Sequence, residues 1–139
     1  MKQANPVNIT HIDHVVIRVD DLENMIAFYQ DVFGCKLERG PGEGRLAQLR
    51  AGLSLIDLVD ASGPIGRHGG DVADHTAPNM DHVCFQVDPW DTEAVKEQLR
   101  RHSVEFGEVS DRYGAAGIGP SIYLKDPEGN TVELKGIAR

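Results

Sequence analysis

Residues 12–20 read IDHVVIRVD, and residues 80–88 read MDHVCFQVD. An offset of 68 positions aligns the two stretches with five identical residues in nine, and it places His14 on His82. In both stretches every second residue is apolar, which is the period of a strand with one buried face. The chain therefore contains the same strand twice, each time with a histidine on the mixed face opposite the apolar one.

The same order of elements follows each copy of this strand. Apolar residues recur at helical spacing from Leu22 to Phe33, after a cap-like start formed by Asp20 and Glu23. Pro89 stands at the start of the corresponding helical pattern in the second half. Short strand-like runs complete each half, around 36–39, 45–50 and 53–59, and around 104–109, 121–125 and 131–135. The sequence thus predicts an α+β fold in which a βαβββ module occurs twice in tandem.

The length fits one domain rather than two full-sized ones. The 139 residues are 40% apolar and 26% charged, which is the ordinary balance of a chain that folds around a core. We expect a single domain over residues 1–139, built from repeats at about 9–60 and 79–137. Residues 60–79 contain four glycines and two prolines, and they predict an irregular linker between the repeats.

The charge and the cysteines limit the partners and the compartment. Lys and Arg number 14 against 22 Asp and Glu, so the formal net charge is −8, which argues against nucleic acid and anionic membrane surfaces as partners. Cys35 and Cys84 show no CxxC spacing, and no apolar run approaches the length of a membrane-spanning helix. Because the N-terminus also lacks a signal-peptide pattern, we expect a cytoplasmic protein.

Histidines and carboxylates occupy equivalent positions in the two repeats. Asp57 lies near the end of the last strand of the first half, and Glu133 lies in the last strand of the second half. With His14 and His82 they make two imidazoles and two carboxylates, a ligand set suited to Fe, Mn, Co, Ni or Zn. Asp57 is the weakest member, because its side chain is one methylene shorter than that of Glu133. It is either a direct ligand, an outer hydrogen-bond acceptor or a salt-bridge partner.

Three stretches together resemble a known family. They are IDHVVIRVDDLENMIAFYQDVFG at 12–34, MDHVCFQV at 80–87 and SIYLKDPEGNTVEL at 121–134. The chain from about residue 12 to 135 resembles the vicinal oxygen chelate superfamily. That superfamily includes glyoxalase I, methylmalonyl-CoA epimerase, extradiol dioxygenases and fosfomycin-resistance transferases.

The resemblance implies a cup-shaped mixed sheet of about eight strands, with the helices on the outside, around one divalent metal ion. Its metal ligands match His14, His82 and Glu133, and a fourth glyoxalase-type position matches Asp57, where glyoxalase I typically has Glu. Relatives form dimers and sheet edges need covering, so we expect a homodimer. Bleomycin-sequestering relatives lack the metal ligands, which makes a purely binding role the weaker interpretation here.

These observations favour a metal-dependent isomerase or lyase of the glyoxalase type. The metal would polarise a carbonyl of a small substrate chelated through adjacent oxygens, while the catalytic carboxylate of Glu133 or Asp57 moves a proton between neighbouring carbons through an enolate or ene-diolate. One alternative is an extradiol-type dioxygenase, with non-haem iron held by two His and one carboxylate. Another is a small-molecule binding or resistance protein. No residue pattern specifies glutathione.

Three further side chains are candidate substrate-binding groups. Arg18 and Gln48 are predicted on the polar wall of the cup, and Tyr123 is predicted to point toward Glu133 and to donate a hydrogen bond to a substrate oxyanion. The alternatives are a solvent-facing arginine and a tyrosine that serves only as an aromatic wall. Residues 60–79 and the glycine-rich 112–120 are predicted as flexible connections that close over the cup.

Overall fold

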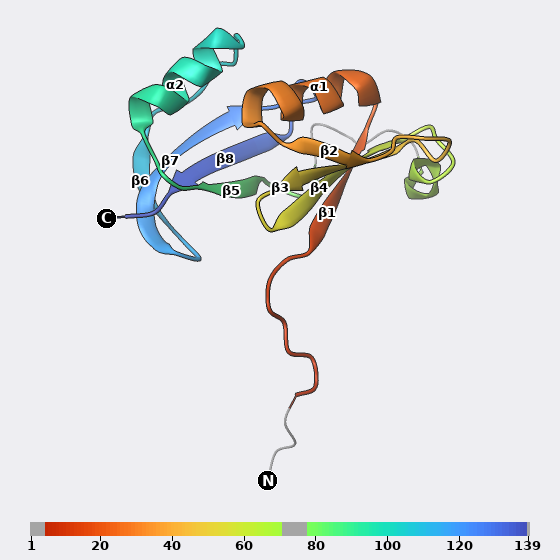
Figure 1. The fold of residues 1–139 in the computed structure, drawn as a ribbon, viewed down its shortest axis with the longest axis horizontal. Helices are drawn as coiled ribbons and strands as arrows, with labels where there is room; N and C mark the ends of the chain where they lie inside the picture. The colour runs from red at the N-terminus through yellow and green to blue at the C-terminus, as the bar shows by residue number, and fades with distance from the viewer. Residues whose placement is uncertain (1–4, 71–77, 139) are drawn as a thin grey trace.

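Two four-stranded sheets and two helices make up the computed structural model, which describes residues 5–70 and 78–138 (Figure 1). The first module comprises β1 (His14–Val19), α1 (Leu22–Phe33), β2 (Lys36–Arg39), β3 (Leu46–Ala51) and β4 (Ser54–Asp60). The second module comprises β5 (Val83–Val87), α2 (Thr92–Arg101), β6 (Ser110–Gly114), β7 (Gly117–Lys125) and β8 (Thr131–Gly136). A short 3-10 helix, η1 (Gly66–Gly69), follows β4.

The two modules share one topology. The strand orders are β1-β4-β3-β2 and β5-β8-β7-β6. In each sheet the first strand runs parallel to the last and the remaining neighbours are antiparallel. The prediction of an α+β fold with two tandem βαβββ modules is therefore confirmed. The strands form two four-stranded sheets rather than the single cup of about eight strands, because β1 and β5 each stand at the edge of their own sheet.

Helix α1 forms where the apolar period predicted it, with one difference at its start. Asp21 rather than Asp20 is the N-cap, since the Asp21 carboxylate accepts a hydrogen bond from the Asn24 amide at 3.1 Å. The helix ends at Gly34, whose φ of 73° is the left-handed conformation that glycine adopts without strain. Its buried stripe consists of Leu22, Met25, Ile26, Tyr29 and Val32.

The stripe of α1 packs against both modules. Leu22, Met25 and Ile26 join the core of the first sheet. Val32 joins the core of the second, whose other fully buried members are Leu99, Ile122, Leu124, Val132 and Leu134. Both helices lie on the same side of the molecule, above the sheets (Figure 1). Helix α1 thereby connects the two modules.

Polar contacts reinforce this connection between the modules. The Tyr29 hydroxyl of α1 donates to the Asp126 carboxylate, in the turn between β7 and β8, at 2.8 Å. The Glu128 carboxylate in the same turn accepts the backbone amides of Asp20 at 2.8 and 3.0 Å and of Asp21 at 2.8 Å. A carboxylate beside the N-terminus of a helix is stabilised by the exposed amides and the helix dipole.

The structure corrects the prediction for the glycine-rich segment 112–120. It is not a flexible connection: most of it lies in the antiparallel pair β6 and β7, joined by a turn at which Gly117 has a φ of 89°. Residues 104–109, predicted as a strand, make only an isolated bridge between Phe106 and Leu124. Both errors have the same cause. Hydrogen bonding to β7, rather than local composition, decides which of these residues form β6.

The predicted linker 60–79 is only partly covered by the structure. Asp60 ends β4 and η1 occupies Gly66–Gly69, while positions 71–77 lie outside the described residues. Within the described part of the chain, neither helix has the length and apolar character needed to cross a membrane.

Candidate active site

Each sheet has one face that packs on a helix and one that we call the open face. On β1 the buried Ile17 and Val19 face α1, so the alternate residues His14 and Val16 lie on the open face. The register pairs Val16 with Asp57 and Asp57 with Gln48, which places these side chains on the same face as His14. By the same rule Glu133 and Tyr123, paired across β8 and β7, lie on the open face of the second sheet.

The first half-site consists of His14, Gln48 and Asp57. Asp57 is only 2% exposed. Its Oδ2 accepts a hydrogen bond from Gln48 Nε2 at 3.2 Å, and its Oδ1 is buried with no hydrogen-bond partner. The hydrogen bond to Asp13, followed by the charge of Asp57, raises the pKa of His14. A buried carboxylate oxygen without a partner is costly, so it marks a position where a cation or a donor fits.

The second half-site consists of His82, Tyr123 and Glu133. Glu133 is 5% exposed, and its Oε1 lies 3.2 Å from His82 Nε2. The Tyr123 ring meets the His82 ring edge-on, with 5.3 Å between the centroids. Burial, followed by the charge of Glu133, raises the pKa of the Tyr123 hydroxyl. The tyrosine is thereby held as a neutral hydrogen-bond donor next to the carboxylate.

The two histidines are oriented in the same way. His14 Nδ1 lies 2.7 Å from Asp13 Oδ2, and His82 Nδ1 lies 2.7 Å from Asp81 Oδ2. A carboxylate on Nδ1 leaves Nε2 as the atom that binds a metal, and this arrangement is common around metal-bound histidines. Sequence analysis did not assign Asp13 and Asp81 this role, although the 68-residue offset aligns them.

The four predicted ligands do not come together in one group. Among the described residues, no three His, Cys, Asp or Glu side chains are close enough to hold a metal ion. The chemistry of the donors fits a divalent metal, with a His and a carboxylate in each half-site, and the unpaired Asp57 Oδ1 fits it as well. A complete centre therefore requires the two half-sites to face each other.

The predicted substrate ligand Arg18 makes structural contacts. Its Nε donates to the Gly66 carbonyl at 3.0 Å, and its Nη2 donates to the Gly70 carbonyl. The guanidinium also lies directly against Gly69, where a Cβ would collide with it. Arg18 therefore holds η1 against β1, and its role as a substrate ligand stays a prediction.

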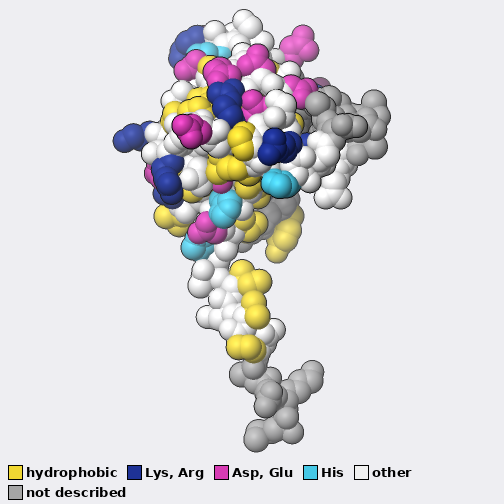
Figure 2. Space-filling model, turned by 90° about the vertical axis from the view of Figure 1, so that its right-hand side faces the viewer, with side chains coloured by type: hydrophobic (Ala, Val, Ile, Leu, Met, Phe, Trp, Pro, Cys, Tyr) yellow, Lys and Arg dark blue, Asp and Glu magenta, His cyan; other side chains and the backbone are white. Residues whose placement is uncertain are grey.

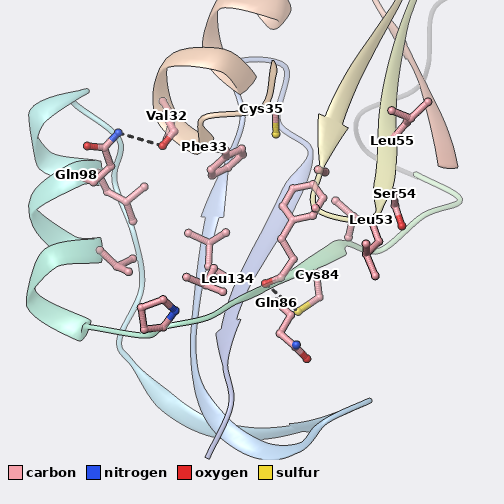
Figure 3. A pocket seen from close by; sticks show the side chains of 18 of the residues that line it. Val32, Phe33, Cys35, Leu53, Ser54, Leu55, Cys84, Gln86, Gln98 and Leu134 are labelled. Atoms are coloured by element: carbon pink, nitrogen blue, oxygen red, sulfur yellow. Dashed lines mark hydrogen bonds between the residues drawn. The ribbon is translucent and has the colours of Figure 1, made fainter. Parts of the chain in front are cut away.

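A separate cavity of about 780 Å³ lies between the modules (Figure 3). Apolar side chains from α1, α2 and β5 dominate its wall, with Phe33 and Cys35 at the end of α1, Leu134 on β8, and Cys84 and Gln86 on β5. His14, His82, Asp57 and Glu133 are not among its lining residues. The cavity is thus distinct from the two half-sites.

Curated relatives align with nearly the whole chain. Human methylmalonyl-CoA epimerase is 28% identical over 134 residues, covering 92% of this chain and 74% of the human protein. The virulence protein STM3117 of Salmonella typhimurium is 30% identical over 132 residues, covering 91% and 83%. Its crystal structure matches with a TM-score of 0.77 and 25% identity, covering 95% of this chain and 100% of that one.

Other solved structures share the fold. Lactoylglutathione lyase from Agrobacterium tumefaciens is 25% identical with a TM-score of 0.68, covering 95% of this chain and 96% of that one. The fosfomycin resistance protein FosX from Listeria monocytogenes, solved with Mn(II) and sulfate, is 20% identical with a TM-score of 0.68, covering 94% and 93%. Divalent metal binding thus occurs on this fold. With its family model matching residues 11–134, the chain belongs to the Glyoxalase/Bleomycin resistance protein/Dioxygenase superfamily.

Proposed function

We propose that the protein is a metal-dependent isomerase or lyase of the glyoxalase type, acting on a small substrate through an enolate or ene-diolate. One observation carries the proposal: an oriented histidine and a buried carboxylate recur in both modules, and Asp57 Oδ1 is buried without a partner. The likeness to an epimerase and to a lactoylglutathione lyase supports proton transfer beside a carbonyl as the chemistry.

The proposed metal ligands are His14, Asp57, His82 and Glu133, and the ion is Ni, Zn, Mn, Co or Fe. When bound, it supplies Lewis-acid polarisation of a substrate carbonyl. Both imidazoles offer Nε2, since an aspartate occupies each Nδ1. Two carboxylates and two imidazoles are ligands of the kind that these ions prefer.

The protein groups around this centre have separate proposed roles. The Glu133 or Asp57 carboxylate accepts the proton from one carbon and returns it to the next. Tyr123 donates a hydrogen bond to the oxygen on which negative charge develops, because its hydroxyl is protonated and adjoins Glu133. The Gln48 amide fixes Asp57 through its 3.2 Å hydrogen bond.

We propose that the working unit is a homodimer in which the first half-site of one copy faces the second half-site of the other. Strand β1 lies at the edge of its sheet, so one side of its backbone has no neighbouring strand among the described residues. A second copy of the chain would cover that side. Large apolar side chains are exposed in the segment that leads into β1, and Figure 2 shows hydrophobic side chains along this projecting N-terminal segment. The exposed apolar residues in this region are Val7, Ile9, Ile12, Val16 and Leu53.

Metal content tests the ligand set. We expect about one divalent metal per chain by elemental analysis of the purified protein, and its loss in His14→Ala, His82→Ala and Glu133→Ala variants that still fold. His102→Ala is the matched control, because His102 lies at the end of α2 outside both half-sites. Full metal content in any two of the three ligand variants would refute the assignment.

Co-expression tests whether two copies share the centre. A His14→Ala chain paired with a His82→Ala chain would form one intact and one doubly defective centre, so about half of the metal per mixed dimer returns. If each centre lies within one chain, the mixture holds no more metal than the separate variants, and the shared-centre proposal fails.

Turnover distinguishes this enzyme from the three-ligand dioxygenase. Asp57→Asn should keep the fold but lose most isomerase activity on hemithioacetals and acyl thioesters, since an amide cannot accept the proton. An iron dioxygenase would keep its catechol-dependent oxygen uptake in the same variant. The buried Asp57 with its unpaired oxygen favours the isomerase.

A further inference from the structure

A buried lysine lies beside the second half-site. Lys135 is on β8 two residues after Glu133, so both side chains are on the open face of the second sheet. It is only 4% exposed, and its Nζ donates a hydrogen bond to the Gly136 carbonyl at 3.3 Å. Lysine is almost never fully buried without a partner. An ammonium group in this position requires a counter-charge from elsewhere.

The course of the Lys135 side chain is made possible by a glycine. A Cβ added to Gly114 on β6 would lie 3.1 Å from Lys135 Cε and 3.5 Å from Nζ. The lysine therefore reaches across the sheet from β8 to β6, and its amino group ends against Gly114. Arg112 lies on the same face of β6, two residues before Gly114, and its Nη1 donates to Ser121, which is the register partner of Lys135, so both positively charged residues adjoin Ser121.

Arg112 is held in place there by neutral groups. Its Nη1 donates to Ser121 Oγ at 2.6 Å and to the Ser121 carbonyl at 3.0 Å. Its guanidinium lies over the Tyr123 ring, 4.5 Å from the centroid. These contacts leave the outer edge of the fork without a partner among the described residues, and Arg112 is half-buried. The fork is thus preorganised and open on one side.

Neither cation forms an ion pair with an acidic side chain of residues 5–70 and 78–138. None of the ion pairs found in the described part of the chain includes Lys135 or Arg112. The carboxylate of Glu133 is engaged by His82. On the neighbouring strand β5, Cys84 pairs with Glu133 and the neutral Gln86 pairs with Lys135. The Lys135 end of this face is therefore electropositive and the Glu133 end is not.

We propose that Lys135, Arg112 and Ser121 form an anion-binding subsite for a carboxylate or phosphate group of the substrate. Lys135 supplies a point charge, Arg112 a two-pronged donor and Ser121 a hydroxyl. Successive residues on one face of a strand are about 7 Å apart, so an anion at Ser121 and Lys135 would lie one position along the open face from Glu133 and Tyr123. The assignment of this subsite to a substrate rests on the proposed function, whereas its binding of an anion does not.

The test is a titration of chelator-stripped protein with inorganic phosphate and, separately, with malonate, followed by amide NMR shifts. We expect shifts at Gly114 and Ser121 and a dissociation constant at least tenfold weaker in Lys135→Met. Lys125→Met is the matched control, because this exposed lysine also lies on the open face, on β7, and its loss should leave binding unchanged. If phosphate binds more tightly than malonate, the subsite is assigned to phosphorylated or phosphonate substrates. If malonate binds more tightly, it is assigned to carboxylate substrates.

A thermal melt of each variant separates folding from binding. Lys135→Met replaces a buried charge with an apolar chain of similar length, so its melting temperature should equal or exceed that of the parent protein. Equal phosphate affinity in Lys135→Met and the parent, equal losses in Lys135→Met and Lys125→Met, or no shift at Gly114 and Ser121 would each overturn the subsite. Because the protein is stripped of metal, these results are independent of whether it proves to be an isomerase.

Discussion

Replacing Tyr29 with phenylalanine removes one hydroxyl from the contact between the two modules. The hydroxyl is completely buried and donates at 2.8 Å to Asp126, which is itself 4% exposed. Asp126 also accepts the Glu128 and Asn130 amides and the Asn130 side chain, at 2.9 to 3.0 Å. After the substitution a buried carboxylate lacks one of its four donors. A hydrogen bond to a charged group contributes roughly 1.5–3 kcal/mol, so we expect Tyr29→Phe to lower the free energy of unfolding by about 2 kcal/mol.

Urea denaturation followed by circular dichroism measures this loss. With a slope of roughly 1–3 kcal/mol per molar urea, the midpoint should fall by about 1 M while the slope stays the same. Tyr113→Phe is the control, because Tyr113 is 83% exposed and its replacement should change stability by less than about 0.5 kcal/mol. A loss below about 0.5 kcal/mol in Tyr29→Phe would show that the bond between α1 and the β7–β8 turn adds nothing to stability.

Three other predictions use the same denaturation assay. Glu128→Gln should cost about 1–2 kcal/mol, because it weakens three hydrogen bonds to the start of α1, whereas the exposed Glu105→Gln should cost almost nothing. Burial raises the pKa of Cys35 to about 11, so the folded state holds this proton more tightly than the unfolded chain. Stability should therefore fall between pH 9 and 11, with Cys35 contributing roughly 2 kcal/mol, and Cys35→Ala should make the fall smaller by that amount. Gly40→Ala should prevent folding, since a Cβ there collides with a strand carbonyl at a φ of 81°, whereas Gly52→Ala meets open space and should cost about 1 kcal/mol.

Elements with a strong local period were predictable from the sequence. Strands β1 and β5 and helix α1 each bury one face, so the spacing of their apolar residues reports the structure directly. The hairpin of β6 and β7 was not predictable in this way, because its glycines suggested a loop. Gly119 is needed where the Gly136 backbone approaches, and that neighbour is distant in sequence.

The candidate site was predictable only within each module. The repeated order of strands identified His82 with Glu133 and His14 with Asp57, and the structure places the members of each pair on one sheet face. The orientation of the two open faces relative to each other depends on how α1 packs between the modules, and no local sequence pattern reveals that packing. Lys135 was missed for a similar reason. The alternation of apolar and polar residues places it on the polar face of its strand, and only its position against Gly114 shows that it is buried.

Helix α1 is encoded in the first repeat, yet Val32 packs in the core of the second sheet and Tyr29 bonds to its final turn. We infer that neither repeat is stable when expressed alone, because each would expose an apolar surface that the other now covers. If the gene arose by duplication of a half-length one, the contacts of α1 would first have joined two identical short chains. Fusion would then have turned an association that depends on concentration into one that does not, leaving later mutations free to make the halves differ.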